Sequence, residues 1–250
     1  MTKRAYGWRP DKPDARDHVA KAASVFRVLP KRVDLRAGCV PVQDQGNLGS
    51  CTAHAIAGAI GYLAVNAKAI VVLPRAPSRL FVYYQERVIE RSVKIDAGAE
   101  IRDGVKACAK VGVPHESFWP YAVPKFTTKP PPMAYVDASL RKITEYQRVT
   151  GLRALRTSLA DGFPVVFGFS VYESFESDEV ATHGQVPMPA KSERLLGGHA
   201  VLAVGYDDAS QRLIVRNSWG AKWGDKGYFT LPYGYVTNRN LSDDFWTVRA

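Results

Sequence analysis

Three residues of this sequence, Cys51, His199 and Asn217, have types and contexts that could carry out nucleophilic catalysis. Cys51 stands near the start of a run of small and apolar residues, 50–60, which predicts a helix buried in a core. The unpaired N–H groups at a helix N-terminus favour a thiolate, so we expect this position to lower the pKa of Cys51. A cysteine among alanines is, taken alone, more often a small core residue, so Cys51 needs partners to count as a nucleophile.

His199 and Asn217 are placed where they could be those partners. His199 begins an apolar run that predicts a strand, 199–206, and Asn217 ends the next predicted strand, 213–217. The turn-like residues 207–210 between them predict a hairpin, which would bring the two side chains to the same end. Asn217 could then accept the imidazole N–H and leave the other ring nitrogen for a thiol. A histidine at a strand start is otherwise more often a satisfied core residue.

The elements that would position these residues fall into a helical part and a β part. Helical patterns at 78–89 and 101–111 follow the first helix, and prolines 130–132 then interrupt regular structure. Beyond them, β-branched and aromatic runs predict further strands at 165–171 and 227–231. The sequence therefore predicts an α+β fold, and a cleft between two such halves is a common place for an active site.

Composition excludes several other classes of protein. The net charge is +10, but residues 1–32 hold nine lysines and arginines against three aspartates. This basic, proline-containing segment predicts an extended arm, and nucleic-acid binding is not expected as the main function because no glycine-rich phosphate loop is present. The longest apolar stretch, Ala55–Val65, has 11 residues, too few for a membrane span.

The cysteine pattern and the N-terminus suggest the cellular compartment of the protein. Three cysteines cannot form a disulfide framework, and Cys39 and Cys108 are interpreted as structural thiols. No apolar signal region follows Met1, so we expect a cytoplasmic protein, with export by a leaderless route as the alternative. The five histidines are scattered and no zinc-binding spacing occurs, so neither a metal nor a cofactor is expected.

Three sequence blocks resemble the Cys, His and Asn blocks of the papain and cathepsin family of cysteine peptidases. They are residues 45–51, 198–206 and 217–224, and His199 and Asn217 follow Cys51 by 148 and 166 residues. The resemblance covers about residues 33–231 and is similar to the bacterial branch of the family. Leu48 stands where the family usually has a disulfide cysteine, which agrees with a reducing compartment, and Thr52 stands where an aromatic residue is usual.

This resemblance implies a papain-like fold for residues 33–250. It places a helical half at about 37–132, an antiparallel barrel-like β half at about 133–250, and the active site between them. It also implies a cysteine endopeptidase without a cofactor, acting on proteins or peptides through a thioester acyl-enzyme. A peptide ligase or transferase, and a non-catalytic binding protein, remain alternatives on the same fold.

The resemblance further assigns roles to individual residues. Cys51, His199 and Asn217 are implied to be catalytic, and Gln45 with the Cys51 backbone N–H is implied to form the oxyanion hole. Trp219 is implied to shield the bond between histidine and asparagine from water. The residues implied to bind substrate are Gly49, Ser50, Ala97, Gly98, Gly168, Gly198, Ala200 and Trp219.

The basic arm, residues 1–32, is too short to form a full inhibitory pro-domain of the family's usual length. It carries apolar residues that need a surface on which to be buried, among them Tyr6, Trp8 and Leu29. One hypothesis is that the arm packs near the mouth of the cleft and limits access to Cys51. The alternatives are a disordered tail or a structural strap on the back of the molecule.

Overall fold

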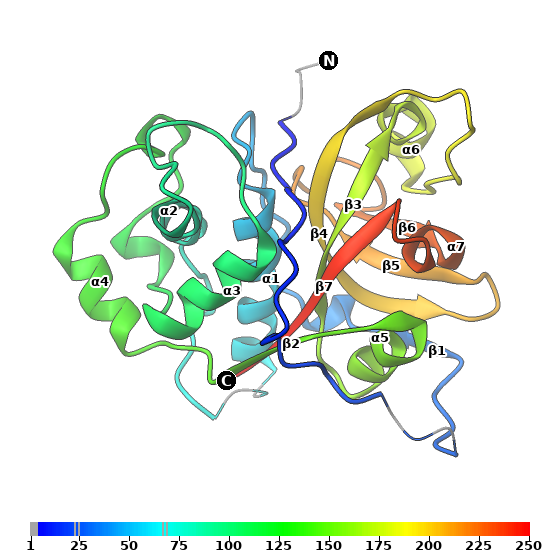
Figure 1. Cartoon of the computed structure of the whole chain (residues 1–250), viewed down its shortest axis with the longest axis horizontal. Helices are drawn as coiled ribbons and strands as arrows, with labels where there is room; N and C mark the ends of the chain where they lie inside the picture. The colour runs from blue at the N-terminus through cyan, green and yellow to red at the C-terminus, as the bar shows by residue number, and fades with distance from the viewer. Residues whose placement is uncertain (1–4, 23, 25, 67, 69) are drawn as a thin grey trace.

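A seven-stranded antiparallel sheet and a group of helices form two halves of the chain, as Figure 1 shows. The structure, a computed structural model, describes residues 5–22, 24, 26–66, 68 and 70–250. The helical half holds α1 (Cys51–Val65), α2 (Arg79–Ile89), α3 (Ile101–Lys110) and α4 (Pro132–Ser139). Three more helices flank the sheet: α5 (Gly151–Ala160), α6 (Asp178–His183) and α7 (Tyr233–Thr237). Short 3₁₀ turns complete the helical structure.

The sheet runs in the order β2-β7-β3-β4-β5-β6, and β1 pairs with β4 off this path. Its strands are β1 (Arg32–Asp34), β2 (Glu145–Arg148), β3 (Val165–Tyr172), β4 (Leu195–Asp207), β5 (Arg212–Arg216), β6 (Tyr228–Pro232) and β7 (Ser242–Arg249). The pairing of β4 with β5 places Leu202 opposite Arg216, which brings the middle of β4 near the end of β5.

The structure confirms the helices and strands that the sequence predicts. The three predicted helices are α1, α2 and α3, and the four predicted strands are β3, β4, β5 and β6. Sequence patterns missed β7 because it begins with Ser242, Asp243 and Asp244, polar residues that disfavour a strand. They also missed α5, whose first residue is a glycine with a φ of 78°.

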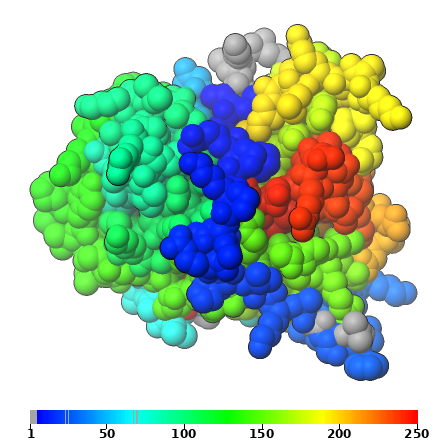
Figure 2. Space-filling model, viewed as in Figure 1, coloured from blue at the N-terminus to red at the C-terminus, as the bar shows by residue number. Residues whose placement is uncertain are grey.

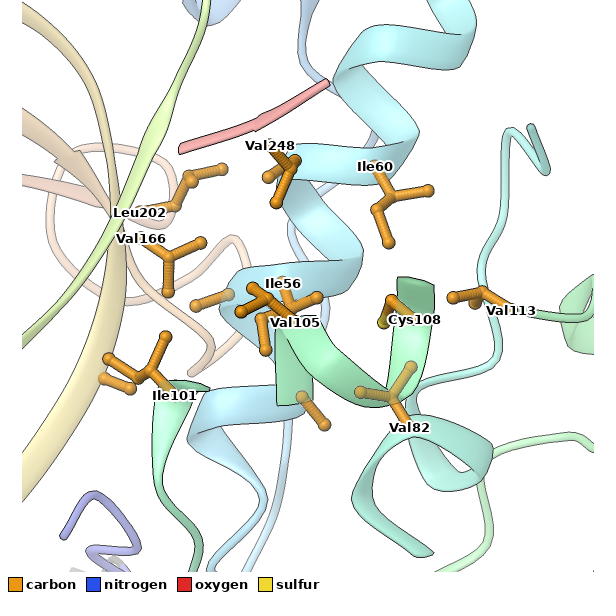
Figure 3. Close-up of a cluster of buried hydrophobic side chains, with 14 of the residues drawn as sticks. Ile56, Ile60, Val82, Ile101, Val105, Cys108, Val113, Val166, Leu202 and Val248 are labelled. Carbon is orange, nitrogen blue, oxygen red and sulfur yellow. The ribbon is translucent and has the colours of Figure 1, made fainter. Parts of the chain in front are cut away.

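Helix α1 packs against both the other helices of its half and the sheet, which explains why it is apolar all round. Every residue from 51 to 63 is buried. Figure 3 shows Ile56 and Ile60 of α1 in one cluster with Val105 of α3 and with Leu202 of the sheet. Each fully buried side chain of this size contributes about 1.5–3 kcal/mol through burial, so this packing fixes the end of α1 that carries Cys51.

The helices in the described part of the chain are all too short or too polar to span a membrane.

Candidate active site

Cys51 is the first residue of α1, and His199 lies on β4 directly across from it. The backbone N–H of Ala200, the residue after His199, donates to Cys51 Sγ at 3.3 Å, which places the thiol against this part of β4. His199 Nε2 and Asn217 Oδ1 are 2.8 Å apart. Because an amide oxygen can only accept, Nε2 carries the proton of this bond and Nδ1 is the nitrogen that can exchange a proton with the thiol. The hairpin predicted from the sequence therefore brings His199 and Asn217 together.

Aromatic rings enclose the bond between His199 and Asn217. The Trp219 ring centroid lies 5.2 Å from that of His199. The ring centroid of Phe169, on the neighbouring strand β3, lies 5.9 Å from that of His199. Trp219 is buried, as are both partners of the bond. A hydrogen bond in such a water-poor environment is electrostatically stronger than one in solvent, so the imidazole orientation is held firmly.

Gln45 directs its amide N–H groups at two carbonyl oxygens, one of which belongs to the N-terminal arm. The hydroxyl of Ser218 donates to Gln45 Oε1 at 2.6 Å, which fixes the direction of the amide. The amide nitrogen Nε2 then donates to the carbonyl oxygen of Leu48 at 2.9 Å and to that of Ala5 at 3.1 Å. A neutral donor aimed at a carbonyl oxygen next to a nucleophile is the arrangement that stabilises an oxyanion.

The Ala5 carbonyl belongs to the N-terminal arm, which lies in the cleft between the two halves. Figure 1 shows this segment, in dark blue, running between α3 and the sheet, and Figure 2 shows it filling the boundary between the halves. Ala99 donates to the carbonyl of Gly7 at 2.7 Å and accepts from the N–H of Arg9 at 3.1 Å, while Trp8 donates to the carbonyl of Gly198 at 2.9 Å.

The arm also contacts the catalytic groups themselves. The backbone N–H of Gly7 faces the sulfur of Cys51 and acts to lower the pKa of the thiol. The ring of Tyr6 meets that of His199 edge to face, with centroids 6.0 Å apart. A side chain at position 7 would place its Cβ 1.9 Å from the carbonyl oxygen of Gly49, so only glycine lets the arm come this close.

Trp8 fills a pocket between the two halves. A Cβ added to Gly168 would lie 1.9 Å from the indole, and one added to Gly198 would lie 2.5 Å from the Trp8 carbonyl oxygen. At the far end of the pocket, the indole Nε1–H donates to Asp244 Oδ2 at 3.1 Å. Trp8 is only 9% exposed, so the pocket takes up nearly the whole side chain.

Beyond the cleft, a buried ion network anchors the arm. Arg148 binds Asp11 at 2.9 Å, Asp17 at 3.0 Å and Asp244 at 3.0 Å. Arg102 binds Asp17 at 2.7 Å. Buried arginine and carboxylate groups of this kind are costly to separate, so residues 11–17 are held far more firmly than an ordinary terminus.

Burial of the thiol overrides the effect expected from the helix N-terminus. Burial raises the pKa of Cys51 to about 11, although the backbone N–H groups of Ala200, Gly7 and Thr52 act to lower it. The predicted lowering of the pKa of Cys51 is therefore wrong for the state with the arm docked. The sequence could not indicate this, because the segment that excludes water from the thiol lies more than 40 residues away in the chain.

A predicted consequence is that arm docking and protonation of Cys51 favour each other. Because docking raises the pKa of the thiol, docking is most stable below the pKa of the undocked thiol and weakens as the pH rises toward about 11. We expect slow alkylation of Cys51 by iodoacetamide at pH 7 in the full chain, and at least about tenfold faster alkylation in Trp8→Ala. Equal rates in the two proteins at pH 7 would show that the arm does not control the thiol.

The residues implied to bind substrate lie in different surroundings in the structure. Gly49, Gly98, Gly168 and Gly198 each lie against the backbone or side chains of the arm. Ala200 and Trp219 lie beside the catalytic groups.

The structure gives Ser50 and Ala97, which were also implied to bind substrate, other surroundings than expected. The Ser50 hydroxyl bonds to the Tyr121 hydroxyl at 2.7 Å inside the helical half, so its side chain does not line the cleft. Ala97 is half-buried, and it is Ala99, which the sequence analysis did not single out, that forms the backbone pairing with the arm. Asp244 was also missed, because nothing in a run of polar residues marks it as the end of a pocket.

Comparison with known proteins agrees with this geometry. Residues 29–245 match the model of the papain family of cysteine proteases. The chain belongs to this family. A crystal structure of xylellain, a cysteine protease from Xylella fastidiosa, superimposes with a TM-score of 0.90 and 43% identity, covering 100% of this chain and 98% of that one.

The chain also matches two further relatives and a solved structure at lower identity. A peptidase C1-like protein of Acanthamoeba polyphaga mimivirus is 41% identical over 98% of this chain and 87% of its own length. Cysteine proteinase 3 of Entamoeba histolytica is 26% identical, and the chain covers 64% of its length. Digestive procathepsin L 3 of Tenebrio molitor, at 18% identity and a TM-score of 0.72, shares the fold.

Proposed function

We propose that this papain-family cysteine protease is an endopeptidase in which Cys51 is the nucleophile, His199 the acid and base, and Asn217 the residue that orients the imidazole. The observation that carries this proposal is the position of a peptide carbonyl: that of Ala5 accepts from Gln45 Nε2 at 3.1 Å, while the N–H of the next peptide group, that of Gly7, faces the Cys51 sulfur. A substrate carbonyl bound there would have its developing negative charge next to a fixed amide donor.

The proposed reaction has two stages and needs no cofactor. The thiolate of Cys51 attacks the carbonyl carbon, and the imidazolium of His199 gives its proton to the leaving amine, which releases the first product and leaves a thioester. Water then loses a proton to His199 and attacks the thioester, which frees Cys51 and the second product. The backbone edge of Ala99, which pairs with the arm here, supports the binding of an extended peptide.

We further propose that residues 5–9 of the arm block the cleft of the resting enzyme. The arm occupies the place of a substrate without offering a bond for cleavage, because its two contacts with the catalytic groups fall on successive peptide groups. Gln45 binds the carbonyl of the bond between residues 5 and 6, whereas the sulfur of Cys51 faces the N–H of the bond between residues 6 and 7. The arm can therefore limit the access of substrates to Cys51 without being cleaved itself.

A cytoplasmic location stays part of this proposal, and the free thiols of Cys39, Cys51 and Cys108 are compatible with it.

Incubating the protein with a peptide library and identifying the products by mass spectrometry would test the activity. The proposal expects internal cleavage with incorporation of one oxygen from labelled water, also when an amine acceptor is present. Products joined to the amine would instead favour a transferase, and removal of single terminal residues only would favour an exopeptidase.

Gln45→Ala is predicted to reduce kcat for a peptide substrate by about 10²–10³-fold, with little change in KM, because the lost donor acts on the charge that develops in the transition state. Steady-state kinetics would measure both constants. Gln147→Ala is a matched control, since Gln147 lies on β2 and its side chain donates to the surface residue Glu145. A reduction below threefold in Gln45→Ala, in folded protein, would remove Gln45 from the oxyanion site.

A further inference from the structure

A small cavity borders both Asn217 and His54, a histidine of α1 that the proposed reaction does not use. Both side chains are buried, with 3% of Asn217 and 6% of His54 exposed. The cavity has a volume of about 10 Å³, and the rest of its wall is formed by residues 55, 200–202, 216 and 218. This volume is close to what one buried water needs. The cavity therefore joins a second imidazole to the residue that orients the catalytic one.

The amide of Asn217 has one end paired and the other end unpaired. Its Oδ1 accepts from His199 Nε2 at 2.8 Å and from the backbone N–H of Ser218 at 2.8 Å. Its Nδ2, a donor, is buried and has no hydrogen-bond partner among the residues that the structure describes. A buried donor without an acceptor is costly, so the orientation that points Oδ1 at the imidazole needs a partner for Nδ2.

His54 offers an acceptor, because its surroundings fix the tautomer of the ring. Nδ1 lies 2.9 Å from the carbonyl oxygen of Ser50, and since a carbonyl oxygen can only accept, Nδ1 carries the proton. Burial, together with the charge of Arg79, lowers the pKa of His54 to about 3, so the ring is neutral at pH 7. Nε2 is then an acceptor, and within the described chain it too is buried without a partner.

Contacts inside the helical half hold the His54 ring in one orientation. The ring of Tyr121 meets it edge to face, with centroids 4.8 Å apart. The Tyr121 hydroxyl donates to the carbonyl oxygen of Gln45 at 2.9 Å and accepts from the hydroxyl of Ser50 at 2.7 Å. A side chain whose own orientation is fixed in this way can in turn fix the orientation of a neighbour.

We propose that His54 is a positioning residue for the catalytic amide, to which it is linked by one buried water that accepts from Asn217 Nδ2 and donates to His54 Nε2. This water pairs both buried groups and so favours the orientation in which Oδ1 faces His199. If the amide turned over, Nδ2 would face His199 Nε2 and the imidazole proton would have to move to Nδ1, the nitrogen needed by the thiol. The proposal rests on the peptidase function above.

A larger pocket gives this water a way in from solvent. It has a volume of about 320 Å³, borders His54 and Asn217, and reaches the exposed residues Gln43 and Arg75. None of the described residues that line it belongs to the arm, so the water can exchange while the arm is docked.

Two substitutions of His54 separate this role from packing. His54→Phe keeps a ring and removes the acceptor, whereas His54→Gln places a polar amide near the position of Nε2. Both lose the bond from Nδ1 to Ser50, so the difference between them reports on the group at the Nε2 position. For a fluorogenic peptide, we expect kcat to fall about tenfold in His54→Phe and to stay within about threefold of wild type in His54→Gln. KM should stay within about twofold in both, because the amide acts after the substrate has bound.

Asn217→Ala is the background that tests the link directly, because it removes the amide that His54 is proposed to hold. Adding His54→Phe to Asn217→Ala should lower kcat by less than about twofold, whereas a packing defect would cost as much as in the wild-type background. His183→Phe is the matched control, since His183 is an exposed histidine of α6. It should leave kcat within about twofold of wild type.

A wild-type kcat in His54→Phe, equal losses in His54→Phe and His54→Gln, or a full loss in the Asn217→Ala background would each overturn the proposal and leave the peptidase function intact. If His54→Phe does not fold, His54→Met, which has the length of glutamine without its amide, takes its place under the same criteria. If neither the wild type nor Trp8→Ala hydrolyses any peptide, the peptidase function fails and the proposal falls with it.

Discussion

Replacing Cys51 by alanine is expected to reduce kcat for peptide hydrolysis by about three to six orders of magnitude, because the substitution removes the nucleophile and leaves only binding and the oxyanion site. The change is small, and Cys51 lies at the end of α1, so the fold should be retained. Kinetics with a fluorogenic peptide and a circular dichroism spectrum would measure both effects.

Cys39→Ala and Cys108→Ala are the controls for this prediction. Cys39 is half-buried on a loop and Cys108 lies in the core of the helical half, and burial raises the pKa of both thiols. Each variant should keep its activity within a fewfold of wild type. Hydrolysis by Cys51→Ala at close to the wild-type rate, or a large loss in either control, would mean that Cys51 is not the nucleophile.

Trp8→Ala is expected to raise kcat/KM for a long peptide at least about tenfold. The substitution empties the pocket and removes the bond to Asp244, and truncating a buried tryptophan costs about 3–5 kcal/mol, here of arm docking. A short peptide should show a similar gain in kcat/KM only if it also occupies the pocket that Trp8 fills. Peptides of both lengths should therefore be compared.

Phe26→Ala is the matched control, since Phe26 is an aromatic residue of the same arm and is 91% exposed. Unchanged kinetics in Trp8→Ala would mean that residues 5–9 do not gate the cleft. A point substitution is a sharper test than deletion of residues 1–29, because that deletion also removes Asp11, Asp17 and the bridge from Val19 to Arg148.

Residue patterns were sufficient to predict the elements that carry the catalytic groups. The all-apolar run after Cys51 indicated a buried helix, and α1 is buried because it packs against both the other helices and the sheet. The two strand patterns around residues 207–210 indicated a hairpin, and its pairing places His199 and Asn217 within 2.8 Å of each other. These are local signals, in which neighbouring residues specify neighbouring structure.

What the sequence could not predict depends on contacts between distant segments. The place of the arm follows from the fit of Trp8 between Gly168 and Gly198 and from the ion pairs of Asp11 and Asp17. None of these contacts leaves a periodic pattern, because an extended segment takes its shape from the surface on which it lies. The raised pKa of Cys51 is a result of the same contacts.

The most direct test of the central claim is to label the full chain with a peptidyl epoxide and to map the modified residue by mass spectrometry. The epoxide requires both a nucleophilic thiolate and a bound peptide backbone, so it reports the catalytic site and the cleft together. The account predicts a single modification, at Cys51, which forms faster in Trp8→Ala than in wild type and is absent in Cys51→Ala. Labelling of Cys39 or Cys108 with Cys51 unmodified, in protein that hydrolyses peptides, would contradict it.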